Sequence, residues 1–121
     1  MKYLLLIYSN PATWDTMSTE QRDAMANEAD ALLKELQESG EWLGGCALAD
    51  PENTKTIRVR GDAPAVTGGP FLEAKEHLAG YCLVECESVE RATEIAVSWP
   101  DARYTAVELR PIMDTCGGLE M

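Results

Sequence analysis

Six consecutive apolar residues near the N-terminus, from Tyr3 to Tyr8, constrain the fold more than any other feature of the chain. A run without polar alternation is typical of a strand that is buried on both faces of a sheet. The run is shorter than the roughly 7–15 apolar residues of a signal-peptide core and much shorter than the ~18 residues of a membrane span. We therefore expect an internal strand, ended by Asn10-Pro11, in a cytoplasmic protein without a membrane segment.

Two helices are predicted, each from a capping signal. Ser18 is the expected N-cap of the first helix, Gln21 completes a capping box, and Gly40 is expected to end the helix. Ser88 is the expected cap of the second helix, which Pro100 ends. The first helix carries an apolar stripe at helical spacing, formed by Met25, Ala29, Leu32, Leu33 and Leu36.

Further strands are predicted over residues 41–48, 54–60, 81–87 and 105–110, with a short one over 65–67. Gly44-Gly45 in the first of these indicates a bulge or a close backbone approach. The order of elements is that of the α+β, ferredoxin-like β-α-β-β-α-β plan, with both helices on one face of an antiparallel sheet. We expect one domain over residues 1–114 and a loose tail over 115–121.

This plan leaves one face of the sheet without helices. The first strand is apolar on both sides, and the segment from Tyr81 to Cys86 also has no plainly polar side. An exposed apolar face of that size exceeds what a monomer normally tolerates. We therefore expect a homodimer in which two sheets pack face to face.

Charge and cysteine content exclude several classes of protein. Ten basic residues against 21 acidic ones give a net charge of −11, which disfavours direct binding of nucleic acid or of an anionic membrane. Cys82 and Cys86 would lie about 13 Å apart along a strand, too far for a disulfide. With one histidine, no C-x-x-C pair and no phosphate-binding glycine motif, we expect reduced thiols, no metal and no cofactor.

The charged residues that follow the turn at Gly68-Gly69-Pro70 form the first candidate site. Lys75 is expected to position an anion, and Glu73, if desolvated by Phe71 or Trp14, could act as a base. Trp14 is counted with the ligand-binding residues. The alternative is that this cluster bonds backbone groups and only holds the loop in shape.

Arginines on two strands form the second candidate site. Arg58 and Arg60 share one strand face and Arg110 lies on another strand, so together they could clamp a carboxylate or phosphate. The alternative is cross-strand pairing with Glu85 or Glu108.

Two aromatic residues and one helix face are open to more than one interpretation. Tyr81 either offers a phenol to a pocket or fills the dimer core, and His77, in a loop-like stretch, is either a general base or solvated. The acidic face of the first helix is either solvated or a docking site for a basic partner, and carries Glu28, Asp30, Glu35 and Glu38.

Residues 66–76, Val-Thr-Gly-Gly-Pro-Phe-Leu-Glu-Ala-Lys-Glu, resemble the signature loop of the YCII-related family, often written D-G-P-F-x-E-x-K-E. Other segments similar to the family are Lys2–Tyr8 with Trp14, Leu78–Tyr81, Pro100–Arg103 and Val107–Pro111. The resemblance implies a dimeric α+β barrel. It also implies an association with extracytoplasmic-function sigma factors, with which members of this branch are often linked.

Two positions depart from the family pattern. Gly68 stands where the signature loop usually has aspartate, so any role of that carboxylate is absent here. Better-studied relatives carry a His–Asp pair proposed as catalytic, with the histidine on the first helix. The predicted helix from Ser18 to Ser39 has no histidine, so no such pair is transferred to this chain.

Two hypotheses follow for function. In the first, the homodimer binds or converts a small anionic metabolite near the signature loop. Arg58, Lys75, Trp14 and Arg110 then hold the ligand, while Glu73 or Tyr81 handles a proton. Analogy of fold alone associates isomerase, lyase or monooxygenase-like chemistry with such a barrel, and whether the protein is an enzyme stays open. In the second, the protein is a regulatory protein whose acidic helix binds a sigma factor.

Overall fold

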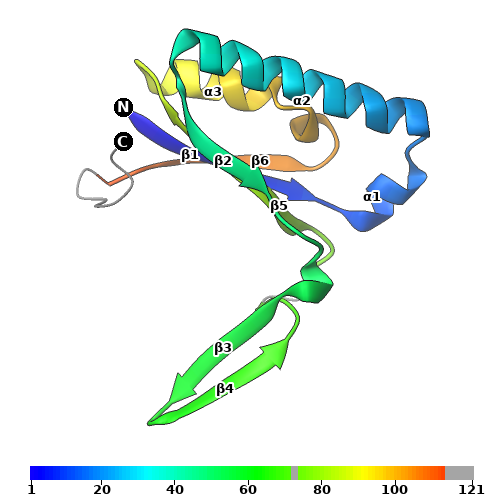
Figure 1. The fold of residues 1–121 in the computed structure, drawn as a ribbon, viewed down its shortest axis with the longest axis vertical. Helices are drawn as coiled ribbons and strands as arrows, with labels where there is room; N and C mark the ends of the chain where they lie inside the picture. The colour runs from blue at the N-terminus through cyan, green and yellow to red at the C-terminus, as the bar shows by residue number, and fades with distance from the viewer. Residues whose placement is uncertain (72–73, 114–121) are drawn as a thin grey trace.

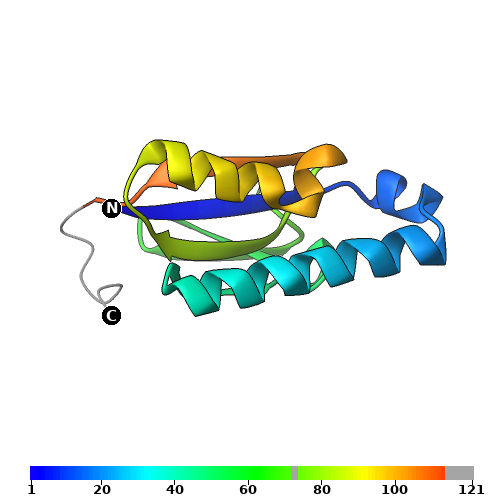
Figure 2. The same cartoon turned by 90° about the horizontal axis from the view of Figure 1, so that it is seen from above.

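A four-stranded antiparallel sheet covered by two helices forms the body of the molecule in a computed structural model, which describes residues 1–71 and 74–113. The strands of this sheet lie in the order β2-β5-β1-β6, with bounds Trp42–Ala47, His77–Glu85, Lys2–Ser9 and Ala106–Pro111. Helices α2 (Thr19–Ser39) and α3 (Val89–Ser98) cover one face (Figures 1 and 2). This is the predicted ferredoxin-like arrangement, which is confirmed.

Strand β1 is internal, as the apolar run predicts, and pairs with β5 on one side and β6 on the other. Its residues Tyr3, Leu5 and Ile7 are buried beneath the helices, whereas Leu4 and Leu6 are half-buried on the opposite, open face. The core between sheet and helices consists of Tyr3, Leu5, Leu32, Leu36, Cys82, Val84, Cys86, Ala92 and Ile95.

The capping signals are confirmed at both long helices. The backbone N–H of Gln21 donates to Ser18 Oγ at 3.1 Å, and the backbone N–H of Ser18 donates to Gln21 Oε1 at 2.8 Å. Gly40 ends α2 with a left-handed φ of 82°, which glycine adopts without strain. Ser88 Oγ accepts from the backbone N–H of Arg91 at 3.1 Å and starts α3.

Two differences from the prediction bear on the site. A short helix α1 (Pro11–Thr16) follows β1, and Asn10 Oδ1 caps it by accepting from the backbone N–H of Ala12 at 3.0 Å. Strand β5 begins at His77, not near residue 81, because His77 pairs with Ser9 of β1. The prediction that His77 lies in a loop is therefore wrong. The predicted tail over 115–121 lies outside the described residues.

Gly45 allows the edge strand β2 to approach β5 closely. A Cβ atom added at Gly45 would lie 2.8 Å from Cys82 Cα, and the register of β2 shifts between Trp42 and Gly44. The predicted close approach is therefore confirmed.

A hairpin inserted between β2 and β5 departs from the sheet. It consists of β3 (Lys55–Arg60) and β4 (Ala63–Gly68), follows the short turn η1 (Pro51–Asn53), and forms a separate two-stranded sheet. Figure 1 shows that this hairpin, called the β3–β4 arm below, projects from the body on the side opposite the helices. No helix within the described residues is long and apolar enough to cross a membrane.

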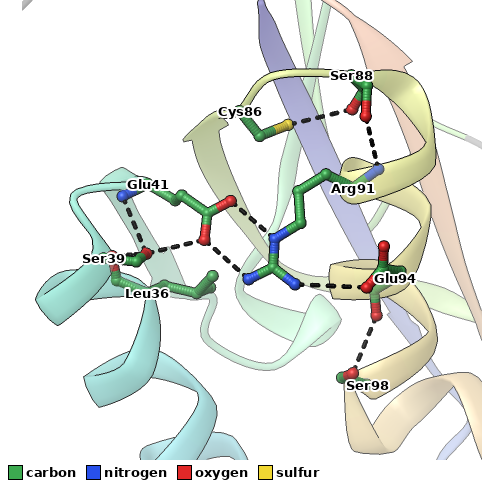
Figure 3. Close-up of polar contacts among 8 residues, drawn as sticks. All are labelled: Leu36, Ser39, Glu41, Cys86, Ser88, Arg91, Glu94 and Ser98. Carbon is green, nitrogen blue, oxygen red and sulfur yellow. Dashed lines mark hydrogen bonds and ion pairs between the residues drawn. The ribbon is translucent and has the colours of Figure 1, made fainter.

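A bidentate ion pair joins the end of α2 to α3 (Figure 3). Arg91 Nε and Nη2 each donate to the Glu41 carboxylate at 2.8 Å, and Ser39 Oγ donates to the same group at 2.8 Å. The Arg91 hydrogen bonds hold the pKa of Glu41 below its ordinary value, helped by Ser39 and opposed by partial burial. The pair therefore fixes the two helices relative to each other on the sheet.

We expect Arg91→Ala to lower the free energy of unfolding by about 1–2 kcal/mol at pH 7. Because the folded pKa of Glu41 is lowered, this contribution is present above the unfolded value of about 4.3 and is lost as the pH falls through the folded value. Urea unfolding at pH 7 and at about pH 3 measures the difference. Arg103→Ala, which breaks an exposed pair with Glu28, is the control and is expected to change much less. Equal losses of unfolding free energy in the two variants would show that the Arg91–Glu41 pair stabilises the fold no more than the exposed Arg103–Glu28 pair does.

Candidate functional site

Asp101 lines two cavities of the molecule. The smaller, of about 370 Å³, lies between α2 and strands β2 and β5. The larger, of about 810 Å³, lies beside α1 and the turn η1. Both volumes are in the range of small-molecule sites.

Asp101 is held at this junction by the 3-10 turn η2 (Pro100–Arg103), which directly follows α3. Pro100 is buried, and the backbone carbonyl of Asp101 accepts N–H donors from Tyr104 at 3.1 Å and Thr105 at 2.8 Å. The hydroxyl of Thr105 donates to the same carbonyl at 3.2 Å. The backbone of Asp101 is thus anchored independently of its side chain.

The carboxyl group of Asp101 is half-buried without a bonding partner from another residue in the part of the chain that the structure describes. Burial raises its pKa above the ordinary value for aspartate, and its own backbone amide offsets part of this rise. A desolvated carboxyl group that faces a cavity can accept a hydrogen bond from a ligand, or give and take a proton.

The larger cavity contains two residues that the sequence singled out, Trp14 and His77. The guanidinium of Arg22 lies 4.7 Å from the centre of the Trp14 ring, and its Nη2 donates to the Trp14 carbonyl at 2.7 Å. These contacts hold α1 against α2. Three further carboxylate residues line the cavity besides Asp101: Asp15, Asp50 and Glu52.

The smaller cavity is mainly apolar, with indole rings from Trp42 and Trp99 and the carboxylate residue Asp30 in its lining. Tyr81 and Cys46 lie opposite each other across β5 and β2 and also line it. The Cys46 thiol raises the pKa of the Tyr81 hydroxyl.

Tyr81 also lines a third cavity, on the open face of the sheet, and its pairing with Leu6 places its side chain on that face, where it is 39% exposed. Both interpretations of Tyr81 stay predictions. Cys46, Cys82 and Cys86 are free thiols, and burial raises the pKa of Cys82 to about 12.

The positively charged candidates lie elsewhere. Arg58 is on the β3–β4 arm, with its guanidinium 5.3 Å from the centre of the Phe71 ring. Lys75 is exposed in the segment that precedes β5. Arg110 belongs to β6 and pairs with Leu4 of β1. None of the three lines the two Asp101 cavities.

The cross-strand ion pairs predicted as the alternative role of the arginines are also not observed among the described residues. Within residues 1–71 and 74–113, no ion pair joins Arg58, Arg60 or Arg110 to Glu85 or Glu108. Glu73 lies outside the described residues. The structure therefore places Trp14 and His77 in one cavity with Asp101, whereas the side chain of Tyr81 belongs to the open face. Arg58, Lys75 and Arg110 line neither Asp101 cavity.

Asp101 is the main residue that the sequence interpretation missed. The available signal was its position directly after Trp99-Pro100, an apolar pair at the end of the second helix. A carboxylate beside such residues is one that folding can desolvate. The α2 residue Asp30 was noted only as part of an acidic face.

Comparison with known proteins agrees with this fold. A family model described as the YCII-related domain matches residues 1–115. An uncharacterized protein of Rhizobium meliloti (strain 1021) is 29% identical over 114 residues, covering 93% of this chain and 92% of the relative. The match spans the sheet, both long helices, the arm and the Asp101 turn. The chain belongs to the YCII-related domain family.

Proposed function

We propose that this protein binds a small molecule in the two cavities that meet at Asp101. The carrying observation is the Asp101 carboxyl group, which is desolvated and lacks a bonding partner from another described residue, although η2 holds its backbone firmly. Keeping such a group without a partner lowers stability, so it is typical of a site that a ligand completes.

The cavity linings favour a ligand that donates hydrogen bonds. They contain five carboxylate residues and, as described, no lysine or arginine: Asp15, Asp30, Asp50, Glu52 and Asp101. An amine or hydroxyl directed at Asp101 would satisfy its carboxyl group, while Trp42 and Trp99 would contact an apolar or aromatic part. Asp101 is then the group placed to exchange a proton with the ligand.

Ligand-observed NMR with three probes of matched shape tests this proposal: 2-phenylethylamine, 2-phenylethanol and phenylacetate. We expect the amine to bind at least about tenfold more tightly than the carboxylate, and Asp101→Asn to weaken amine binding by about tenfold or more. Asp23→Asn removes the same charge from an exposed position outside the cavities and is the control. Equal binding to the two Asn variants would contradict a role for Asp101.

The anionic ligand predicted from the sequence is the competing proposal within the same class. It requires Arg58 and Lys75 to reach the ligand from the arm and from the segment before β5. The anionic ligand would be favoured over the cationic or neutral one if phenylacetate binds preferentially and an Arg58→Ala/Lys75→Ala double variant loses this binding. Unchanged phenylacetate binding in that variant would show that neither Arg58 nor Lys75 contacts the ligand.

We also infer that the chain is a homodimer formed through the open face of the sheet. An apolar cavity of about 430 Å³ on this face is lined by Leu4, Leu6, Leu43, Leu83 and Ile112, with Tyr81 at its edge. Apolar surface of this kind, on the face that none of the described helices covers, supports a second copy as the covering partner.

The second candidate function is docking of a basic protein, such as an extracytoplasmic-function sigma factor, on α2. The exposed acidic residues of this helix favour it, among them Glu20, Asp23, Glu28, Glu35 and Glu38. Binding to a purified sigma factor should fall with salt and with Glu35→Gln/Glu38→Gln, but not with Asp101→Asn. No binding at low salt would count against this function.

A further inference from the structure

The β3–β4 arm has a basic face and a mainly apolar face, on which Lys55 lies at the start of β3. Its register places Ile57 opposite Val66 and Val59 opposite Pro64, so these four side chains share a face. Ile57, Val59 and Val66 are 62%, 56% and 61% exposed. Arg58 and Arg60 lie on the other face, opposite Ala65 and Ala63.

An isolated two-stranded hairpin is marginally stable in water, and no other element within residues 1–71 and 74–113 covers this one. Every strand residue of the arm except Thr56 is exposed. The arm strands pair with each other and belong to a sheet separate from that of the body. The apolar face of the arm is therefore surface that a partner molecule would have to cover.

Charge identifies the kind of partner. Residues 54–71 carry three of the ten basic residues of the chain and only one of its 21 acidic ones. The remainder of the chain is strongly acidic, so the basic arm is complementary to the body of a second copy.

The position of the arm agrees with this partner. It lies on the side of the sheet opposite the helices (Figures 1 and 2), where the open face carries its apolar cavity. A second copy placed against the open face would therefore lie beside the arm.

We propose that the apolar face of the β3–β4 arm packs against the second copy of the chain, so that each subunit holds its partner with its arm. This proposal rests on the homodimer inferred above. It adds a second contact region, formed by Ile57, Val59, Pro64 and Val66, to the contact between the sheets.

Photo-cross-linking tests where the arm lies. Benzoyl-phenylalanine is introduced at Val66, and, as a control, at Ala65 on the opposite face of the same strand. The full chain is prepared as an equal mixture of ¹⁴N- and ¹⁵N-labelled protein, so that mass spectrometry distinguishes cross-links between subunits from those within one. We expect inter-subunit cross-links from position 66 to be at least about fivefold more abundant than from position 65. Cross-links within one chain only, or none from position 66, would overturn the proposal.

Dimer dissociation constants, measured by sedimentation, distinguish the contribution of the arm contact from that of the contact between the sheets. Ile57→Glu/Val66→Glu should weaken the dimer by about tenfold or more, because two apolar contacts are replaced by charges. Ala63→Glu/Ala65→Glu adds the same charge to the basic face and should weaken it clearly less. A dimeric wild type with an unaffected Ile57→Glu/Val66→Glu variant would overturn the arm contact and leave the sheet dimer standing. A monomeric wild type would overturn the homodimer itself.

Discussion

Replacing Asp101 with asparagine is expected to stabilise the folded protein at neutral pH while it weakens amine binding by about tenfold or more. The two effects have one cause, because the carboxyl group that a ligand would use is desolvated in the free protein. Burial raises its pKa, so the ionised form is disfavoured by the folded state. Asparagine keeps the shape of the side chain and removes that cost.

The pH dependence of the stabilisation has a definite sign. Since the folded pKa of Asp101 is raised, the folded protein holds its proton more tightly than the unfolded chain does. Above the folded pKa, the buried Asp101 carboxylate therefore lowers the free energy of unfolding of the wild type by its full amount. This loss disappears below the pKa of about 3.9 that aspartate has in the unfolded chain. The gain in Asp101→Asn should be largest near pH 7 and vanish near pH 3.

Urea unfolding of wild type and variant across this pH range measures the effect. Asp23→Asn is expected to leave stability at pH 7 unchanged or slightly lower, because Asp23 lies near the N-terminus of α2, where negative charge is favoured. If Asp101→Asn instead lowers stability at pH 7, its carboxylate stabilises the fold. The proposed function then loses the observation that carries it.

Most of the fold could be predicted from the sequence because its signals are local. The capping box at Ser18 and Gln21, the glycine at position 40 and the unbroken run in β1 each act within a few residues. The start of β5 could not be predicted in this way. His77 becomes part of a strand only through pairing with Ser9, which is 68 positions away in the sequence.

The site was less predictable because its residues depend on tertiary placement. Arg58 shows clean strand alternation, but nothing local indicates that its hairpin leaves the sheet, which carries the guanidinium away from the Asp101 cavities. Asp101 shows the converse case, because in the sequence it is an ordinary carboxylate residue. Its carboxyl group becomes partly buried only when α2, α1 and the start of β5 come to lie around it in the folded protein. Trp14 and His77 were identified as candidates, but their common cavity requires the unpredicted helix α1.

The second large effect is expected at the open face of the sheet, where Leu6→Glu should convert the proposed dimer to a monomer. Leu6 lies in the internal strand β1 and lines the apolar cavity of this face. In a sheet-to-sheet dimer the new carboxylate would be buried without a partner, close to its symmetry mate, in a chain that already carries a net charge of −11. We expect the dimer dissociation constant to rise by at least ~100-fold.

Sedimentation velocity at several concentrations measures this change, and Val97→Glu supplies the matched control. Val97 is an exposed aliphatic residue on α3, on the other side of the molecule from the open face, so its variant should stay dimeric. Because Leu6 is only half-buried in one chain, Leu6→Glu should keep the circular dichroism of the folded protein. A folded Leu6→Glu dimer would contradict the sheet contact. Leu6 lines neither of the Asp101 cavities, so the folded Leu6→Glu monomer should still bind 2-phenylethylamine, which separates ligand binding from assembly.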